Sequence, residues 1–154
     1  TCGTSHVSFC ASLGADHVID YHKEDWHQAI PPRSLDMVYD TVALKGTGDL
    51  AYDVLKDGGF FVTLLQQGLA STATSLRRPS VKQHFFLLDA SDHTRLDVLR
   101  AIAEQGKLRG HIDRNFSIAQ VASAVNASIS GHTCGKISVV PSGAFDSTTS
   151  VAFV

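Results

Sequence analysis

Two short runs of the sequence end in side chains that could contact a bound ligand. Residues 17–20 are β-branched at their centre and are followed by Tyr21, and residues 35–42 end in Asp40-Thr41-Val42. Both runs have the length and composition of buried strands in a parallel sheet. In open α/β sheets, ligands bind at the carboxyl ends of the strands. The carboxylates, hydroxyls and phenol at these ends are therefore the first candidates for a binding site.

Sites of other kinds have weaker support in the sequence. The eight histidines are scattered along the chain, and no cysteine or histidine pair has the close spacing of a zinc site. His132 and Cys134 lie two residues apart, but no further ligand flanks them. A G-x-S-x-G nucleophile motif is absent, and Cys10 falls on the apolar face of an expected helix. We therefore expect no metal site and assign no catalytic residue to this chain.

Strands and helices are expected to alternate along the chain, which places these candidates at one edge of a sheet. Periodicity predicts helices over residues 7–13, 23–30, 46–55, 94–105 and 118–129, and strands over 17–20, 35–42, 60–65, 81–88 and 137–140, after a strand that ends at Thr1-Cys2. Residues 66–80 are expected to form a loop with at most a helical turn, and residues 107–116 a short extended segment. The alternation predicts a doubly wound, mostly parallel α/β sheet over residues 1–141, with a loose tail over 142–154.

Length, charge and cysteine content narrow the class of protein. The chain has 154 residues, one domain's worth, and a net charge of -2 without a basic stripe, so we expect no nucleic-acid partner. No apolar run is long enough to span a bilayer, so we expect no membrane segment. Three cysteines without ligand spacing favour reduced thiols in an intracellular protein. Since the chain starts at what looks like a strand end, we expect it to be a fragment of a longer protein.

Five segments resemble motifs of the medium-chain dehydrogenases/reductases, and more narrowly those of their zinc-free quinone oxidoreductase-like branch. They are LGADHVIDY at 13–21, LDMVYDTV at 35–42, LKDGGFFV at 55–62, EQGKL at 104–108 and GKISV at 135–139. Each motif is weak alone, but all five occur in the family's order. The resemblance implies a Rossmann fold in which Thr1-Cys2 ends the second strand. The family's first strand, its glycine-rich turn and its catalytic domain are therefore expected upstream, because no G-x-G-x-x-G occurs in this chain.

The resemblance also implies where a cofactor would lie. NAD enzymes place an acid after the second strand, where it binds the ribose hydroxyls. The corresponding residues here have no acid, so we expect NADP(H), with Gly3, Thr4 and Ser5 near the 2'-phosphate and His6 as a supplement. Relatives often carry Lys or Arg at this place, and this chain does not. The alternative is that these residues only form a turn and cap the next helix.

Further cofactor contacts are implied along the remaining strand ends. Tyr21 would approach the 2'-phosphate or the adenine ribose, and Lys136 would reach a phosphate across the cleft. The other implied contacts are Thr41 and Val42 at the ribose or pyrophosphate, Leu64 at the nicotinamide ribose, and Phe85, Phe86 and Leu87 at the nicotinamide face. Such an apolar wall suits hydride transfer, which needs positioning and exclusion of water. Ordinary structural roles are the alternative for each residue: a half-buried tyrosine, core phenylalanines and a surface lysine.

The implied activity of the intact protein is NADPH-dependent reduction of quinones, enones or similar activated double bonds. Substrate would bind through the missing catalytic domain, and a homodimer is expected. The alternatives are a non-catalytic nucleotide-binding or interaction module, an inactive truncated product, or an enoyl reductase of polyketide type that acts in trans. We expect a cytoplasmic location and leave a mitochondrial one open.

Overall fold

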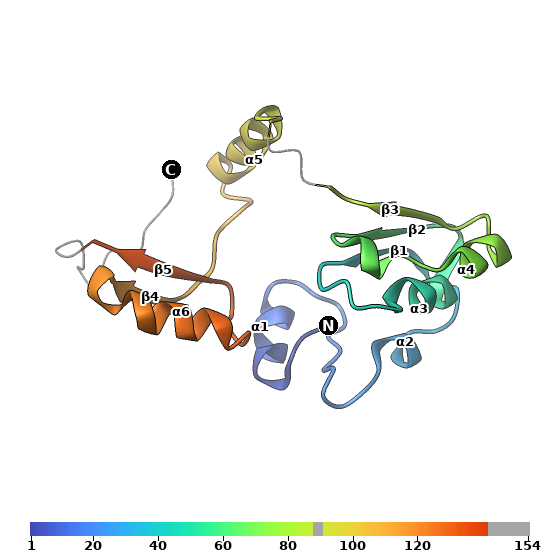
Figure 1. The fold of residues 1–154 in the computed structure, drawn as a ribbon, viewed down its shortest axis with the longest axis horizontal. Coiled ribbons are helices and arrows are strands. Elements are labelled where there is room, and N and C mark those ends of the chain that lie inside the picture. Colours follow the sequence, from blue (N-terminus) through green and yellow to red (C-terminus); the bar gives the residue numbers. More distant parts are fainter. Residues whose placement is uncertain (88–90, 142–154) are drawn as a thin grey trace. The chain divides into compact units, whose positions relative to one another are not determined.

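The computed structural model describes residues 1–87 and 91–141, which belong to two compact units, Thr1–Asp89 and Ala90–Val154 (Figure 1). Each unit is described by itself. The predicted tail over 142–154 and the last residue of the strand expected over 81–88 lie outside the described residues. The single domain expected over residues 1–141 stays a prediction.

The first unit is built on a three-stranded parallel sheet in the order β1-β2-β3 (Figure 1). Its strands are β1 (Leu35–Asp40), β2 (Leu55–Thr63) and β3 (Lys82–Phe85). The ladder aligns Asp40 with Thr63, and Thr63 with Phe85. The three strands therefore reach the same edge of the sheet in register, and the predicted parallel α/β class is confirmed.

One helix supplies most of the packing on this sheet. Helix α3 (Thr47–Val54) buries Ala51, Tyr52 and Val54, and its core partners include Leu55 and Phe61, neither of which is exposed at all. The short helix α2 (Trp26–Ala29) contacts α3, and Trp26 packs against this core. Alternate residues of β2 point into the core, as the two-residue repeat of a strand requires. Burial of this helix face explains why the 46–55 periodicity was a good predictor.

The N-terminal segment departs from its prediction. The 3-10 turn η1 (Thr4–His6) and α1 (Val7–Ser12) form the expected helical stretch, but Ser5 caps neither, because no side chain caps either element. The strand expected over 17–20 is wrong and is reduced to a single parallel bridge between Cys2 and Asp20. The backbone hydrogen bonds of this bridge run from the Cys2 N–H to the Ile19 carbonyl at 3.0 Å and from the Tyr21 N–H to the Cys2 carbonyl at 3.2 Å, so the pairing is confined to one place.

The region expected as a loop over 66–80 holds more helix than predicted. It contains a 3-10 turn, η2 (Gln66–Gly68), and α4 (Thr72–Arg77). The hydroxyl of Ser71 accepts a hydrogen bond from the Thr74 N–H at the start of α4. This Ser-capped start is the local signal that the composition of the region obscured.

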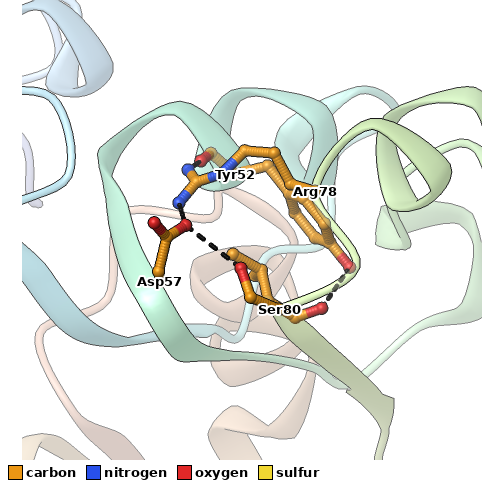
Figure 2. Close-up of polar contacts among 5 residues, drawn as sticks. Tyr52, Asp57, Arg78 and Ser80 are labelled. Carbon is orange, nitrogen blue, oxygen red and sulfur yellow. Dashed lines mark hydrogen bonds and ion pairs between the residues drawn. The ribbon is translucent and has the colours of Figure 1, made fainter.

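A polar clamp closes the opposite, amino-terminal edge of the sheet (Figure 2). The Arg78 guanidinium donates to the carbonyl oxygen of Tyr52 and, over 2.7 Å, to Oδ1 of Asp57. Ser80 donates to the same carboxylate at 3.0 Å, and the Tyr52 hydroxyl donates to the Val81 carbonyl at 3.4 Å. These contacts fix the end of α3 beside the start of β3.

The second unit contains a parallel pair of strands, β4 (Ile112–Ser117) and β5 (Lys136–Val140), and α6 (Val121–Ile129), which contacts both. Ser117 and Gln120 form a capping box at η3 (Ile118–Gln120), which leads into α6. Helix α5 (Thr94–Glu104) confirms the helix predicted there. No helix in the described ranges has the length and apolar character needed to cross a bilayer.

Candidate active-site rim

The carboxyl ends of the three parallel strands form one continuous rim. The ladder runs one residue past the strands, because the Leu64 N–H donates to the Asp40 carbonyl at 3.2 Å and the Phe86 N–H donates to the Thr63 carbonyl at 2.9 Å. Thr41 is exposed, Val42 is 65% exposed and Phe86 is 37% exposed. The residues that follow the strands are therefore aligned and accessible to a ligand along this edge.

A constrained turn carries the first part of this rim. Oδ1 of Asp40 accepts hydrogen bonds from the backbone N–H groups of Val42, at 3.0 Å, and Ala43, at 2.8 Å. Ala43 is fully buried and has a left-handed φ of 57°, which costs a residue with a side chain about 1–2 kcal/mol. Asp40 thus holds Thr41 and Val42 in one defined conformation.

A second cluster surrounds the Cys2–Asp20 bridge, with the Asp20 carboxylate at its centre. Thr4 Oγ1 donates to Oδ2 of Asp20 at 2.6 Å, and Lys23 Nζ lies 3.3 Å from that oxygen. The His22 N–H donates to Oδ1 at 3.1 Å, and His22 Nδ1 lies 3.4 Å from it. The hydrogen bond from Thr4, with those from His22 and Lys23, lowers the pKa of Asp20 to about 2, against the opposing effect of burial. Asp20 is therefore a charged hub that ties the turn after Cys2 to the turn after the bridge.

Aromatic rings cover the Gly3 backbone in this cluster. The rings of Tyr21 and His22 lie with their centroids 4.4 Å apart. A Cβ atom on Gly3 would lie 3.2 Å from His22 Cε1 and 3.3 Å from the Tyr21 hydroxyl. Glycine permits this close approach, and Tyr21 stays 56% exposed. The cluster thus combines a close-packed backbone with an accessible phenol.

A cavity of about 220 Å³ lies beside β1. Thr1, next to the bridge, lines it on one side, and Asp40 and Thr47 line it near the end of β1. Leu35 and Val38 of β1 add apolar walls. In the described part of the first unit, β1 is hydrogen-bonded to a neighbouring strand only on its β2 side. The cavity therefore runs beside the open edge of β1.

The structure groups most of the predicted site residues in two places within the first unit. Gly3, Thr4 and Tyr21 meet around Asp20, and Ser5 and His6 follow in η1. Thr41, Val42, Leu64, Phe85 and Phe86 lie along the rim, followed by Leu87, which is 75% exposed. Lys136 begins β5 in the second unit, so its predicted role at the cleft is untested. The cofactor roles of all these residues stay predictions.

The sequence did not predict the contacts of three residues that organise these groups. Asp20 and Asp40 were visible as polar residues at strand ends, but their hydrogen bonds to Thr4 and to the 42–43 backbone could not be foreseen. Lys23 had the appearance of an ordinary surface charge. The spacing of three residues between Asp20 and Lys23, which allows the ion pair that the structure shows, is a sequence signal that could have pointed to it.

The residues of the first unit offer polar groups in one place and apolar surface in another. The exposed phenol of Tyr21 and the ammonium of Lys23 offer hydrogen-bond donors to a phosphate at one place, and Val42, Leu64 and Phe86 offer apolar surface at the other. Among the described residues, no group of three or more histidine, cysteine, aspartate or glutamate side chains could hold a metal ion. The chemistry that this arrangement supports is binding and orientation of an elongated, partly anionic ligand.

Comparison with protein families matches residues 13–139 to the family described as zinc-binding dehydrogenase. The chain is 32% identical over 143 residues to the 2-methylene-furan-3-one reductase of Solanum lycopersicum, and this match covers 92% of this chain and 32% of that protein. It is 31% identical over 143 residues to the NADPH-dependent alkenal/one oxidoreductase, chloroplastic, of Arabidopsis thaliana, covering 92% of this chain and 33% of that one. The chain thus spans about a third of the length of these two relatives.

Solved structures share the same fold. The quinone oxidoreductase from Coxiella burnetii matches with a TM-score of 0.71 and 26% identity, over 90% of this chain and 43% of that one. The CurF ER cyclopropanase from the curacin A biosynthetic pathway matches with a TM-score of 0.73 and 21% identity, over 90% of this chain and 45% of that one. The Rossmann-like architecture expected from the sequence is therefore confirmed.

Proposed function

Because this chain belongs to the zinc-binding dehydrogenase family of oxidoreductases, we propose that it is the cofactor-binding part of an NADPH-dependent reductase of quinones, enones or similar activated double bonds. The observation that carries the proposal is the alignment of Asp40, Thr63 and Phe85, which brings three strand ends to one edge. Such an edge is where open α/β sheets bind nucleotides. The names of the relatives, which include an NADPH-dependent alkenal/one oxidoreductase, support the reaction class.

The residues of this chain would bind and orient the cofactor and exclude water. When bound, the nicotinamide cofactor supplies the hydride. Thr41 and Val42, held by Asp40, would contact the ribose and pyrophosphate side, and Leu64 would contact the nicotinamide ribose. Phe86, with Phe85 and Leu87 beside it, would form an apolar wall that keeps water from the nicotinamide. No residue of this chain is assigned a proton-transfer step.

The choice of NADP(H) over NAD(H) is the finer part of the proposal. The turn after Cys2 has no carboxylate of its own, and Tyr21 presents a free phenol beside it. The Asp20 carboxylate does lie against Thr4, but every one of its oxygens already accepts a hydrogen bond. Its charge is also compensated by Lys23, so it presents little repulsion to a 2'-phosphate.

The proposal also includes the parts of the complete protein that this chain does not contain. In the described part of the first unit the edge of β1 away from β2 is unpaired, so the first strand of the family would pair there and bring the glycine-rich turn to the rim. A catalytic domain would provide the substrate site. Homodimer formation and an intracellular location complete the proposal; light scattering of the complete protein tests the first.

Fluorescence titration of the complete protein with NADPH and NADH tests the proposal. We expect NADPH to bind at least about ten-fold more tightly, the factor that 1.4 kcal/mol provides. Turnover is then followed by NADPH absorbance with a quinone and with an enone as acceptors. Equal binding or a preference for NADH would remove NADP(H) from the proposal. Binding without turnover of either acceptor would favour a non-catalytic nucleotide-binding module.

A further inference from the structure

Two of the three cysteines of this chain are in contact with each other. Cys2 lies in the bridge to Asp20, Cys10 follows eight positions later in α1, and their thiols are hydrogen-bonded to each other. Both are free cysteines, and both are partly exposed. The third cysteine, Cys134, belongs to the second unit. The first unit therefore holds one pair of reduced, neighbouring thiols that a small molecule in solution can reach.

The backbone holds Cys2 more firmly than Cys10. The Cys2 N–H donates to the Ile19 carbonyl at 3.0 Å, and the Cys2 carbonyl accepts from the Tyr21 N–H at 3.2 Å. Cys10 belongs to a helix of six residues that buries none of them and has no side-chain cap at its start. Helices this short depend on packing for their stability, so α1 can adjust its position. Two hydrogen-bonded thiols beside such a helix need only side-chain rotation and a small shift to reach the geometry of a disulfide.

We propose that Cys2 and Cys10 form a modification site at which hydrogen peroxide, or another hydroperoxide, converts the two thiols into an intramolecular disulfide. The Cys10 thiolate attacks the O–O bond, which breaks, so that a sulfenic acid forms and hydroxide leaves. The Cys2 sulfur then attacks the Cys10 sulfur, the S–S bond forms and water leaves. The proton that Cys10 gave up joins the hydroxide. Two thiols are thus oxidised, and one peroxide is reduced to two water molecules.

The environment of Cys2 assigns the order of the two thiols. Burial and the contact with Cys10 raise the pKa of Cys2, so Cys2 keeps its proton and acts second. The finished disulfide closes a ring around the turn that contains η1 (Thr4–His6) and the Thr4 hydroxyl bound to Asp20. It would tie α1 to the bridge and restrict the unfolded chain, and such a restriction raises the temperature of unfolding. This inference does not depend on the cofactor proposed above.

Peptide mapping of the complete protein tests the site. The protein is treated with hydrogen peroxide, its remaining thiols are alkylated with iodoacetamide, and it is digested with trypsin without reduction. Cys2 and Cys10 fall in one tryptic peptide, because the first lysine or arginine after them is Lys23. We expect this peptide to lose the mass of two hydrogen atoms and to take up no alkyl group, and dithiothreitol should reverse both changes. Cys134 should remain available for alkylation and serves as the internal control.

Substitutions separate the two thiols. Cys2→Ser should accumulate a sulfenic acid on Cys10, which dimedone traps, and Cys134→Ser should form the disulfide as wild type does. The thermal midpoint of the oxidised wild-type protein, read from Trp26, should rise by about 4 °C or more relative to the reduced protein. A wild-type peptide that carries two alkyl groups after peroxide treatment would overturn the inference. A Cys2→Ser protein without a dimedone adduct would overturn the order of attack, and an unchanged midpoint would overturn the link between α1 and the bridge.

Discussion

Replacement of Gly48 by alanine provides a quantitative test of how the rim is supported. Gly48 is the second residue of α3, and a Cβ there would overlap the Ala70 nitrogen and lie 2.6 Å from the Gly68 oxygen. Both obstacles are backbone atoms, which cannot rotate aside. The segment must move, and the hydrogen bond from the Ala70 N–H to Oε1 of Gln83, now 2.8 Å, would be strained or lost.

The expected cost of Gly48→Ala follows from these contacts. Overpacking typically costs about 1–3 kcal/mol, and a weakened hydrogen bond adds about 1 kcal/mol. The better helix propensity of alanine returns at most about 1 kcal/mol. We therefore expect a loss of about 2 kcal/mol in the free energy of unfolding. Because Gly68 also packs against Thr63 and Ala43, the displacement should reach the rim and weaken cofactor binding as well.

Urea denaturation measures this loss directly. Trp26 packs against the core of the first unit, so its fluorescence reports the unfolding of that unit. At a slope of about 1–2 kcal/mol per molar urea, the midpoint should fall by roughly 1–2 M. Gly110→Ala is the control, because a Cβ there meets nothing within 4 Å. Its free energy of unfolding, followed by far-UV circular dichroism, should stay within about 0.5 kcal/mol of wild type. An unchanged or higher midpoint for Gly48→Ala would refute the close packing of α3 on residues 68–70.

Three further changes test other contacts. The folded-state pKa of Asp20, about 2, lies below its usual value, so the stability that its charge contributes is present above about pH 4 and lost as the pH falls toward 2. Asp20→Asn should therefore be less stable than wild type at pH 7, with urea midpoints that converge below pH 4, and a difference in midpoint that stays constant with pH would contradict this. Arg78→Lys keeps the charge but loses the fork that joins the Tyr52 carbonyl to Asp57, so the Trp26-detected stability should fall by about 1–2 kcal/mol; equal midpoints would show that the clamp is unimportant. Burial and the neighbouring Cys10 thiol raise the pKa of the Cys2 thiol, so its alkylation by iodoacetamide should be slower than that of free glutathione at pH 8 and still accelerate above pH 9. Peptide mass spectrometry follows the alkylation, and equal rates at pH 8 would argue against this environment.

The regular elements could be predicted because their signals are local. Helix α3 has an apolar face and a glycine before it, and β2 alternates buried and half-buried residues from Gly59 to Thr63. Where the signal was weak, the prediction erred: α4 is only six residues long and lies in a polar stretch, and its start depends on one serine cap. Residues 17–20 show the opposite failure, because a strand forms only by pairing with another segment, and the pairing here is limited to the bridge between Cys2 and Asp20.

The sequence by itself determined the class of the protein. The alternation of apolar runs, the turn glycines and the five motifs specify parallel strands whose carboxyl ends carry the candidate site, because periodicity and turn chemistry are properties of neighbouring residues. Only the tertiary structure decided which polar groups meet. Thr4 and Asp20 are sixteen residues apart, and their hydrogen bond depends on the register of a single backbone bridge. The sequence showed that the turn after Cys2 has no acid. It did not show that the fold brings the Asp20 carboxylate and the Lys23 ammonium to this turn, since contacts between distant residues are set by packing.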